Sequence, residues 1–270
     1  MLRAHSLLWH YLWVAPNLLL LILGCLIWKR GIARKVPAFF AFAVLSAISE
    51  LAVYAADVVP SVNARIFWGV AWGSLAIEGV LKFVVVGEIF EHIFGSYASV
   101  ARLGKFLIRA FGIVLVLGAT LAAAYAPQDG RFGIVSGAHM LDQTIYLVES
   151  GLLVFIFLFS FYFQLAWERR LFGITLGLGI SSCVHLASWA LMANGGLPDS
   201  KRMMLVFVNM ASYHAVVFVW YYYLLVPGRG THNTPESQSP PPPAALALSV
   251  DLPDHGLEAW NEELERLIRK

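Results

Sequence analysis

Charged residues are scarce in this chain. Asp, Glu, Lys and Arg together make up 13% of its 270 residues, whereas soluble proteins carry about a quarter. Hydrophobic residues make up 59%, and the mean hydropathy is +0.70. The composition excludes a soluble enzyme and a nucleic-acid-binding domain, because both need many more charged groups on their surfaces. The chain is therefore predicted to be an integral membrane protein.

Cysteine is almost absent as well, since the chain holds only Cys25 and Cys183. Both lie inside apolar runs, where a disulfide would require the two residues to meet at the same depth in the membrane. A secreted disulfide scaffold is excluded on this count. We expect both cysteines to serve as small apolar side chains.

Long apolar runs are what the chain does contain. Each has the length of about 20 residues that a helix needs to cross a membrane. The runs are continuous and rich in leucine, which excludes a β-barrel because barrel strands alternate between apolar and polar residues. The sequence predicts an all-α membrane protein with seven transmembrane helices in a domain covering 1–226. The predicted spans are approximately 7–28, 36–56, 66–90, 106–126, 140–165, 171–193 and 203–226.

Basic residues near the ends of these runs are distributed unevenly, and their excess is expected on the cytoplasmic side. The N-terminus is therefore predicted outside and the C-terminus in the cytoplasm. The richer side carries Lys29, Arg30, Arg34, Lys35, Arg102, Lys105, Arg109, Arg169, Arg170 and Arg229. The poorer side carries Arg3, Arg65, Arg131, Lys201 and Arg202.

Two of the runs share a pattern that suggests an internal repeat. Ser46 and Glu50 in the second run align with Ser181 and His185 in the sixth at a separation of 135 residues. With one linking helix between them, helices 1 to 3 and 5 to 7 would run in the same direction, as a parallel 3+1+3 arrangement. Apolar helices also align by composition alone, so the repeat stays open at this point.

The composition changes abruptly after the last run. Residues 227–251 include Pro240 to Pro243 and are predicted to form a disordered Pro-rich cytoplasmic linker. Residues 252–270 are predicted to form a short amphipathic helix, because apolar residues recur there at spacings of three and four. This stripe, a candidate for docking a cytoplasmic protein, consists of Leu257, Trp260, Leu264 and Leu267.

A few ionisable residues lie well inside the predicted spans, where each charge costs roughly 2.5–3.5 kcal/mol. At 1.5 Å of rise per residue, polar groups from six runs, Asn17 among them, fall in one layer roughly 10–18 Å below the outer end. We therefore predict a shared polar core in the outer half of the bundle, as a candidate ligand or proton site. The candidates are Glu50, Glu78, Lys82, Glu149, His185 and His214.

Two interpretations of these candidates stay open. Glu78 and Lys82 are four residues apart, so they share a helix face and can neutralise each other. Glu50 and Glu149 have no such neighbour, so they would pair with a histidine of another helix, remain protonated or reach water. The residues form either a satisfied polar core or a site for a ligand, proton or ion.

Several cofactor and metal chemistries lack the residues that they require. A retinal protein needs a lysine in its last helix, and the run 203–226 contains none. Ser181 and His185 resemble one element of seven-helix hydrolases that also carry two histidines four residues apart. Here Phe218 lies four residues after His214. The sequence therefore predicts no cofactor and no metal, and it favours a protein that is not an enzyme.

Two further patterns are expected to be structural. The aromatic cluster 220–223 is predicted to lie in the membrane interface, where Trp and Tyr are enriched. Small residues permit helices to approach closely. The glycines expected to do so are Gly69 and Gly73 in the third run and Gly173, Gly177 and Gly179 in the sixth.

Three stretches together carry a resemblance to a known group of proteins. They are residues 88–92 (EIFEH) with 102–105 (RLGK), residues 157–161 (FLFSF) through 167–173 (WERRLFG), and residues 257–260 (LEAW). The chain resembles an uncharacterised family of bacterial seven-helix integral membrane proteins. The resemblance implies a multi-pass protein of the bacterial inner (plasma) membrane and implies no particular activity.

The sequence favours a receptor-like or sensory membrane protein, whose polar core responds to a small-molecule ligand or protons and whose tail helix docks a cytoplasmic protein. The alternative is a small-solute or proton-coupled transporter of 3+1+3 helices, which a twofold arrangement around a central cavity would favour. A third hypothesis, a metal-dependent hydrolase within the membrane, requires Glu50, Glu149, His185 and His214 to converge.

Overall fold

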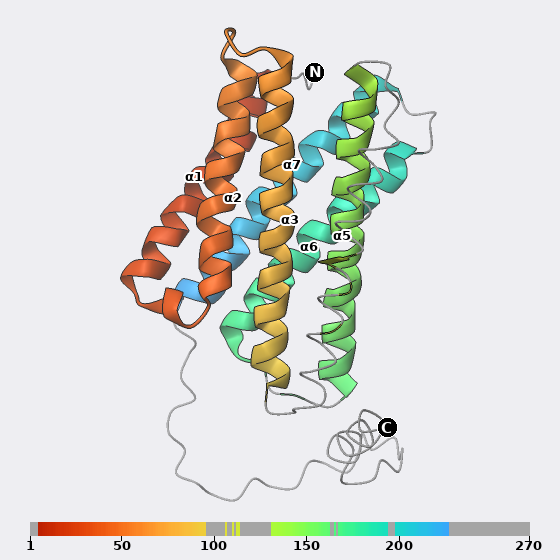
Figure 1. Cartoon of the computed structure of the whole chain (residues 1–270). Coiled ribbons are helices and arrows are strands. Elements are labelled where there is room, and N and C mark those ends of the chain that lie inside the picture. The colour runs from red at the N-terminus through yellow and green to blue at the C-terminus, as the bar shows by residue number, and fades with distance from the viewer. Residues whose placement is uncertain are drawn as a thin grey trace, which may run out of the picture.

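The computed structural model describes residues 5–95, 131–162, 165, 167–193 and 198–226, together with 106, 110, 112 and 113. For 131–141 and 193 it describes the backbone alone. Within these ranges the chain is helical and contains no strand (Figure 1). The predicted all-helical architecture is therefore confirmed for this part of the chain.

Six of the described helices are long and apolar enough to cross a membrane, which makes the chain a multi-pass membrane protein. They agree with six of the seven predicted runs to within a few residues at most of their ends. The helices are α1 (Leu7–Lys29), α2 (Pro37–Val58), α3 (Ala64–Phe94), α5 (Arg131–Tyr162), α6 (Arg169–Ala193) and α7 (Asp199–Leu225), and a short 3₁₀ turn, η1 (Ile32–Arg34), follows α1.

The remaining predicted segments fall almost entirely outside the described residues. The fourth run, 106–126, has only four described positions, so a seventh membrane helix stays a prediction. The linker 227–251 and the tail helix 252–270, with its stripe Leu257, Trp260, Leu264 and Leu267, also lie outside the described residues.

Local sequence signals explain where several helices begin and end. The Ser6 side chain accepts a hydrogen bond from the Trp9 N–H at the start of α1, and Asn63 caps α3 in the same way. After α1 the chain turns at Gly31, whose φ of 68° favours glycine. Pro37 then occupies the first turn of α2, where its missing N–H costs nothing.

The helices form a ring in which each one packs against its neighbours in the order α1, α2, α3, α5, α6, α7 and back to α1. In Figure 1, α1, α3, α5 and α7 run downward while α2 and α6 run upward. The helices α3 and α5 are therefore parallel neighbours. The order of neighbours is also symmetric. When α1, α2 and α3 are exchanged for α5, α6 and α7, each pair of neighbouring helices becomes another pair of neighbouring helices.

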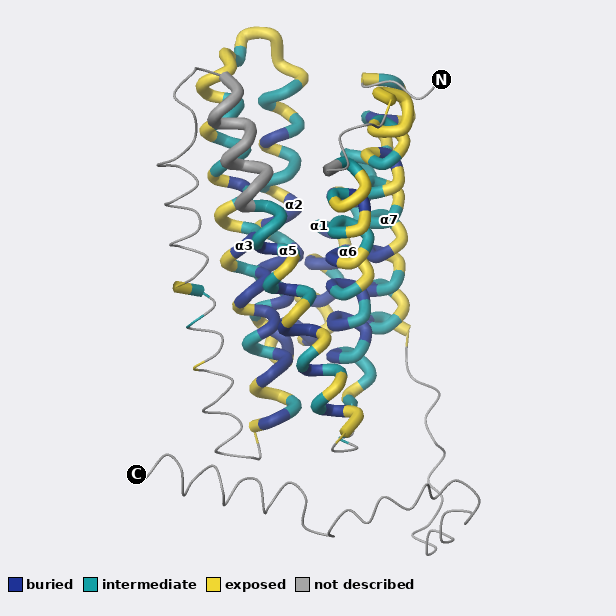
Figure 2. Tube along the Cα trace, turned by 90° about the vertical axis from the view of Figure 1, so that its right-hand side faces the viewer, coloured by how far each residue is buried: buried dark blue, intermediate teal, exposed yellow. Residues whose placement is uncertain are grey.

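The apolar core occupies mainly the lower half of the bundle, where buried residues are most concentrated (Figure 2). Trp220 of α7 lies at its centre with only 1% of its surface exposed, and its ring packs edge-on against Phe39 and Phe42 of α2. The prediction that the cluster 220–223 lies in the membrane interface is therefore wrong for Trp220. The indole is large and apolar, and here it fills the helix junction while its N–H donates to the Ile174 carbonyl oxygen.

An acidic side chain joins the lower ends of two helices. The two Glu88 carboxylate oxygens of α3 accept hydrogen bonds from the backbone N–H groups of Ala38 and Phe39, each at 3.1 Å. These N–H groups belong to the first turn of α2, which has no carbonyl partners of its own. Glu88 thus caps a neighbouring helix and holds α2 against α3.

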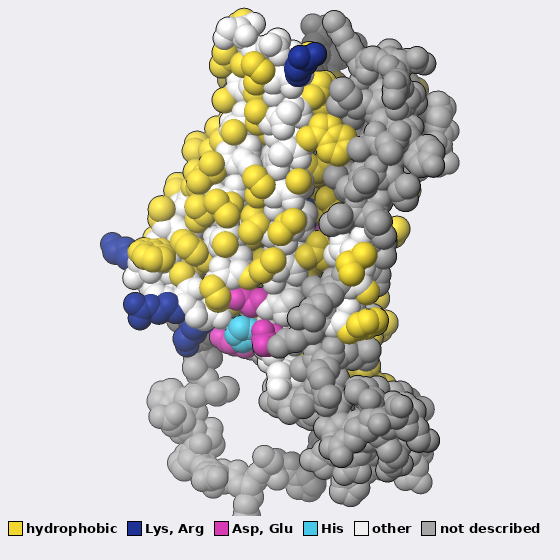
Figure 3. All heavy atoms as spheres, viewed as in Figure 1, with side chains coloured by type: hydrophobic (Ala, Val, Ile, Leu, Met, Phe, Trp, Pro, Cys, Tyr) yellow, Lys and Arg dark blue, Asp and Glu magenta, His cyan; other side chains and the backbone are white. Residues whose placement is uncertain are grey.

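The outside of the bundle has the polarity expected of a membrane protein. Figure 3 shows hydrophobic side chains over the length of α2 and α3, with charged side chains gathered mainly around the lower end. Exposed apolar side chains include Leu18, Ile48 and Val80, each close to the middle of its helix. Such an apolar belt suits contact with lipid rather than water.

Two of the five predicted packing glycines lie at a close helix contact. A Cβ atom built at Gly173 would overlap the Tyr223 side chain, and one built at Gly177 would overlap Trp220. Among the described residues, by contrast, nothing lies within 4 Å of a Cβ atom built at Gly179, Gly69 or Gly73. The packing prediction is confirmed for the first pair, and the described part of the chain gives no such contact for the other three.

The contrast between Gly177 and Gly179 gives a matched test of the α6–α7 contact. We expect Gly177→Ala to lower the unfolding temperature of the purified protein, because overpacking a buried contact costs about 1–3 kcal/mol. Gly179→Ala should leave it unchanged or raise it slightly, since alanine favours helix. Equal unfolding temperatures for the two variants, measured by thermal denaturation in detergent, would contradict the described packing.

Candidate functional site

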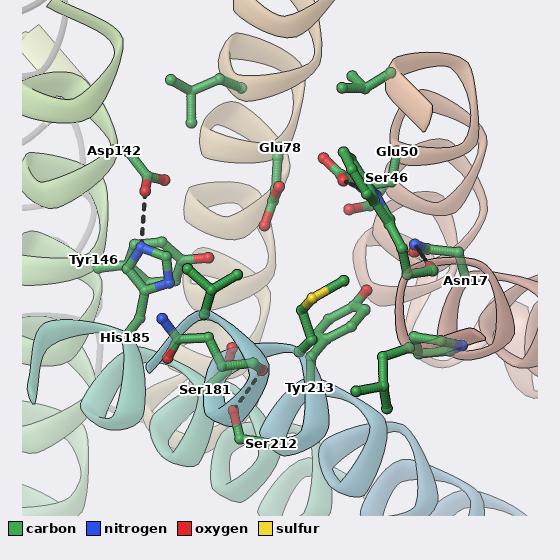
Figure 4. Close-up of a pocket in the computed structure, with 18 of the residues that line it drawn as sticks. Asn17, Ser46, Glu50, Glu78, Asp142, Tyr146, Ser181, His185, Ser212 and Tyr213 are labelled. Atoms are coloured by element: carbon green, nitrogen blue, oxygen red, sulfur yellow. Dashed lines mark hydrogen bonds and ion pairs between the residues drawn. The ribbon is translucent and has the colours of Figure 1, made fainter. Parts of the chain in front are cut away.

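A cavity of about 420 Å³ opens in the upper half of the bundle, above the apolar core. All six described membrane helices contribute to its wall (Figure 4). Phe42, which is 1% exposed, lies one helical turn below the cavity residue Ser46 and belongs to the core that closes the space from beneath. The polar groups that line it include Asn17, Ser46, Glu50, Glu78, Asp142, Tyr146, Ser181, His185, Asn209, Ser212 and Tyr213.

Glu50 of α2 faces the cavity beside an aromatic wall. Its two carboxylate oxygens accept hydrogen bonds from Trp13 Nε1 at 3.3 Å and from Ser74 Oγ at 3.2 Å. The Trp13 ring packs edge-on against Trp9, with ring centres 4.6 Å apart. Both partners of Glu50 are neutral donors, so they orient the carboxyl group without neutralising a charge on it.

Behind the cavity wall, one lysine lies between two carboxylates. Lys82 Nζ is 2.8 Å from a Glu78 oxygen and 3.6 Å from a Glu149 oxygen. Lys82 is 4% exposed and Glu149 is 1% exposed, whereas Glu78 reaches the cavity. The predicted Glu78–Lys82 pair is present, and Glu149 takes the same lysine as its partner rather than a histidine.

A stack of rings connects this lysine to α6. Lys82 Nζ lies 3.7 Å from the Tyr146 ring centre, and the His185 ring stacks on Tyr146 at 3.8 Å. Both groups lie so close to the ring centre that they must occupy opposite faces. The Tyr146 ring therefore separates the ammonium group from the imidazole and contributes a cation–π contact.

His185 Nε2 has two partners that require different protonation. It lies 2.8 Å from Asp142 Oδ2 and 2.7 Å from Trp189 Nε1. A protonated Nε2 can donate to Asp142, whereas an unprotonated Nε2 can accept from the Trp189 indole N–H. The proton on this nitrogen therefore decides which of the two contacts is a hydrogen bond.

The predicted candidates divide into three groups. Glu50, Glu78 and His185 line the cavity, and Lys82 and Glu149 lie directly behind its wall. His214 is not among the lining residues. Its ring stacks on Tyr11 with centres 5.7 Å apart and packs against Phe218.

Asp142 and Tyr146 are site residues that the sequence-based prediction missed. Asp142 comes near the start of its predicted span, so it looked like an ordinary polar residue at a helix end. A usable signal was present, because Asp142, Tyr146 and Glu149 are spaced four and three apart and share one face of α5. An acidic residue on the same face as a buried glutamate should have been counted with it.

Residues that line the cavity recur at a constant separation in the sequence. Ser46, Glu50, Ala71, Leu75 and Glu78 of α2 and α3 all line it. The residues 135 positions later in α6 and α7 line it as well, in the same order. They are Ser181, His185, Val206, Met210 and Tyr213. The two helix pairs thus present corresponding positions to one space, whereas α1 and α5 contribute unrelated positions.

No family model, curated protein or solved structure matches this chain. The resemblance to bacterial seven-helix proteins therefore stays a prediction. What the structure establishes is the broader class, an all-helical membrane protein with six membrane-spanning helices in its described part.

The described residues do not assemble the donors of a metal site. Among them, no three His, Cys, Asp or Glu side chains lie close enough together to hold a metal ion. The hydrolase hypothesis requires Glu149 and His185 to share a metal with Glu50 and His214. Instead Glu149 pairs with Lys82 and His185 contacts Asp142.

The buried lysine gives a testable energetic prediction. We expect Lys82→Met to lower stability strongly, because removing one partner of a buried ion pair typically costs about 3–5 kcal/mol. Adding Glu149→Gln to that variant should recover part of the loss, since it removes the carboxylate left without a cation. Lys201→Met, at an exposed position, is the control. A double variant no more stable than Lys82→Met, in thermal denaturation, would contradict the pairing.

Proposed function

We propose that this protein is a small-solute transporter of the bacterial inner (plasma) membrane, with its substrate site in the cavity between two three-helix halves. The halves are α1–α3 and α5–α7. The coarse part of this statement, a multi-pass helical membrane protein, is established by the six long apolar helices.

The observation that carries the proposal is the repeated cavity wall. Five positions of α2 and α3 and their counterparts 135 residues later all face the same space. In transporters built from repeats, the substrate site lies where the repeats meet, near the middle of the membrane. The symmetric order of neighbours in the helix ring supports a parallel 3+1+3 arrangement. In that arrangement the fourth predicted segment, 106–126, would link the halves.

The shape of the bundle fits one state of an alternating-access cycle. The cavity lies in the upper half, while large side chains such as Phe39, Phe42 and Trp220 fill the lower half. Transport would require the halves to part at the lower end and to close above the cavity. The polar lining supplies groups that a solute would exchange for water.

A receptor-like protein is the second candidate, and the sequence beyond α7 favours it. The predicted amphipathic helix 252–270, joined to α7 by the Pro-rich linker 227–251, would bind a cytoplasmic protein and transmit a signal to it. In that case the cavity binds its ligand from one side only, and the lower half stays closed.

Access from the two sides of the membrane distinguishes the candidates without knowledge of the substrate. Cys25 and Cys183 are both free and would first be replaced by alanine. A cysteine at Ser181 would then be treated with a membrane-impermeant thiol reagent added either to intact cells, where it reaches the outer face of the membrane, or to inverted vesicles, where it reaches the cytoplasmic face. We expect a transporter to react from both sides, because the cavity opens to each in turn.

A cysteine at Val154 is the control for this experiment. Val154 is about half exposed on the outer surface of α5, where lipid would cover it, so it should react from neither side. Reaction of the Ser181→Cys variant from one side alone would reject transport and favour the receptor.

The receptor alternative makes its own prediction about the tail. Deletion of 252–270 should abolish co-purification of any cytoplasmic protein that docks on the stripe, as measured by affinity purification and mass spectrometry. Full-length protein with Leu264→Glu is the matched comparison, because it alters the apolar stripe and keeps the length of the tail. Unchanged co-purification from both variants would argue against docking.

A further inference from the structure

The cavity wall has an excess of acidic groups over basic ones. Glu50, Glu78 and Asp142 line it, and His185 is the one lining residue in the described chain that can carry a positive charge. Lys82, behind the wall, already contacts two carboxylates. The cluster therefore has more carboxyl groups than cations to pair with them, and such a site selects against anions.

A second, independent feature is a buried acceptor for which the described residues supply no donor. Asn17 of α1 is 2% exposed and lines the cavity. Its Nδ2 donates to the Trp13 backbone oxygen at 2.8 Å, whereas its Oδ1 has no hydrogen-bond partner among the residues that the structure describes. A buried amide oxygen without a donor costs about 1–3 kcal/mol, so a ligand that supplies an N–H group here would gain that energy.

Asn17 and Glu50 lie on the same side of the cavity (Figure 4). Trp13 connects them, because it accepts from Asn17 through its backbone and donates to Glu50 through its indole. Trp9 stands beside Trp13, and Tyr213 faces the same space from α7. Aromatic faces next to a carboxylate are the surroundings that attract organic cations.

We propose that the cavity binds a small organic cation of the protonated-amine class, with its ammonium group between Asn17 and Glu50 and its apolar part against the tryptophans. The ammonium N–H groups would donate to Asn17 Oδ1 and to the Glu50 carboxylate, which has lone pairs left beyond its two present hydrogen bonds. The cavity volume of about 420 Å³ suits a molecule of this size. This inference rests on the proposed function and specifies its substrate class.

Binding of three closely matched probes to the purified full-length protein tests the proposal. Benzylamine carries the ammonium donors, benzyl alcohol has the same ring without the charge, and benzyltrimethylammonium has the charge without N–H groups. We expect isothermal titration calorimetry at neutral pH to rank affinity in the order benzylamine, benzyltrimethylammonium, benzyl alcohol. Benzylamine should also raise the unfolding temperature, since it binds the folded state alone.

Two variants assign the contacts. Glu50→Gln keeps the shape of the side chain and removes its charge, so it should weaken both cationic probes by about tenfold or more. Asn17→Ala should weaken benzylamine and leave benzyltrimethylammonium nearly unchanged, because only the former donates to Oδ1. Asp199→Asn removes an exposed carboxylate outside the cavity and should change neither. Unfolding curves of each variant without ligand verify that it folds.

The possible failures are distinct. Benzyl alcohol binding as tightly as benzylamine, an unchanged affinity in Glu50→Gln, or no heat with benzylamine would overturn the cation site. If the protein released protons but none of the three probes produced heat, the cavity would be a proton site. That result would also overturn the cation site. Reaction of the Ser181→Cys variant from one side, combined with benzylamine binding, would reject transport and leave the cation site standing.

Discussion

The arrangement of the upper half of the bundle depends on the buried Lys82 between Glu78 and Glu149. Placing a lysine within a membrane costs free energy unless its charge is neutralised, so α3 must turn this residue toward the interior of the bundle. Glu149 then fixes the rotation of α5, because its carboxylate must meet the same ammonium group. Tyr146, one turn earlier on α5, is thereby placed over the lysine, and His185 of α6 stacks on its other face. One ion pair thus orients three helices around the cavity.

The two halves of the bundle differ in how they are held together. Below the cavity, aromatic and aliphatic side chains pack tightly, with glycines bringing α6 against α7. Above, the contacts are ion pairs and hydrogen bonds, which depend on protonation and can exchange partners with a solute or water. His185, with two partners for one nitrogen, is the clearest case. A rigid apolar base and an adaptable polar upper half suit a protein that binds and releases a ligand.

The sequence predicted the positions of six helices well and the rotation of each helix about its own axis poorly. Length and hydropathy placed six spans, because lipid imposes a minimum apolar length. Depth was predicted from a constant rise per residue, and three of the residues expected at one level, Glu50, Glu78 and His185, line the same cavity. The rotation of each helix about its own axis could not be predicted in this way. The lipid-facing and interior faces of these helices are both apolar, so no hydrophobic stripe indicates which face is buried. His214 and Trp220 were misjudged for that reason. His214 shares the depth of the site but not its direction, and Trp220 looked like an interfacial residue although it faces the core.

The guanidinium of Arg30, just past the end of α1, donates to the backbone oxygen of Leu225, the last residue of α7, at 2.6 Å. Leu225 would otherwise leave a carbonyl oxygen unpaired at the helix end, and the arginine satisfies it from the other half of the molecule. This hydrogen bond therefore holds the first and last described membrane helices together at their lower ends. Any motion that separates α1 from α7 at that end must break this hydrogen bond. The bond would therefore resist opening of the lower half of the bundle.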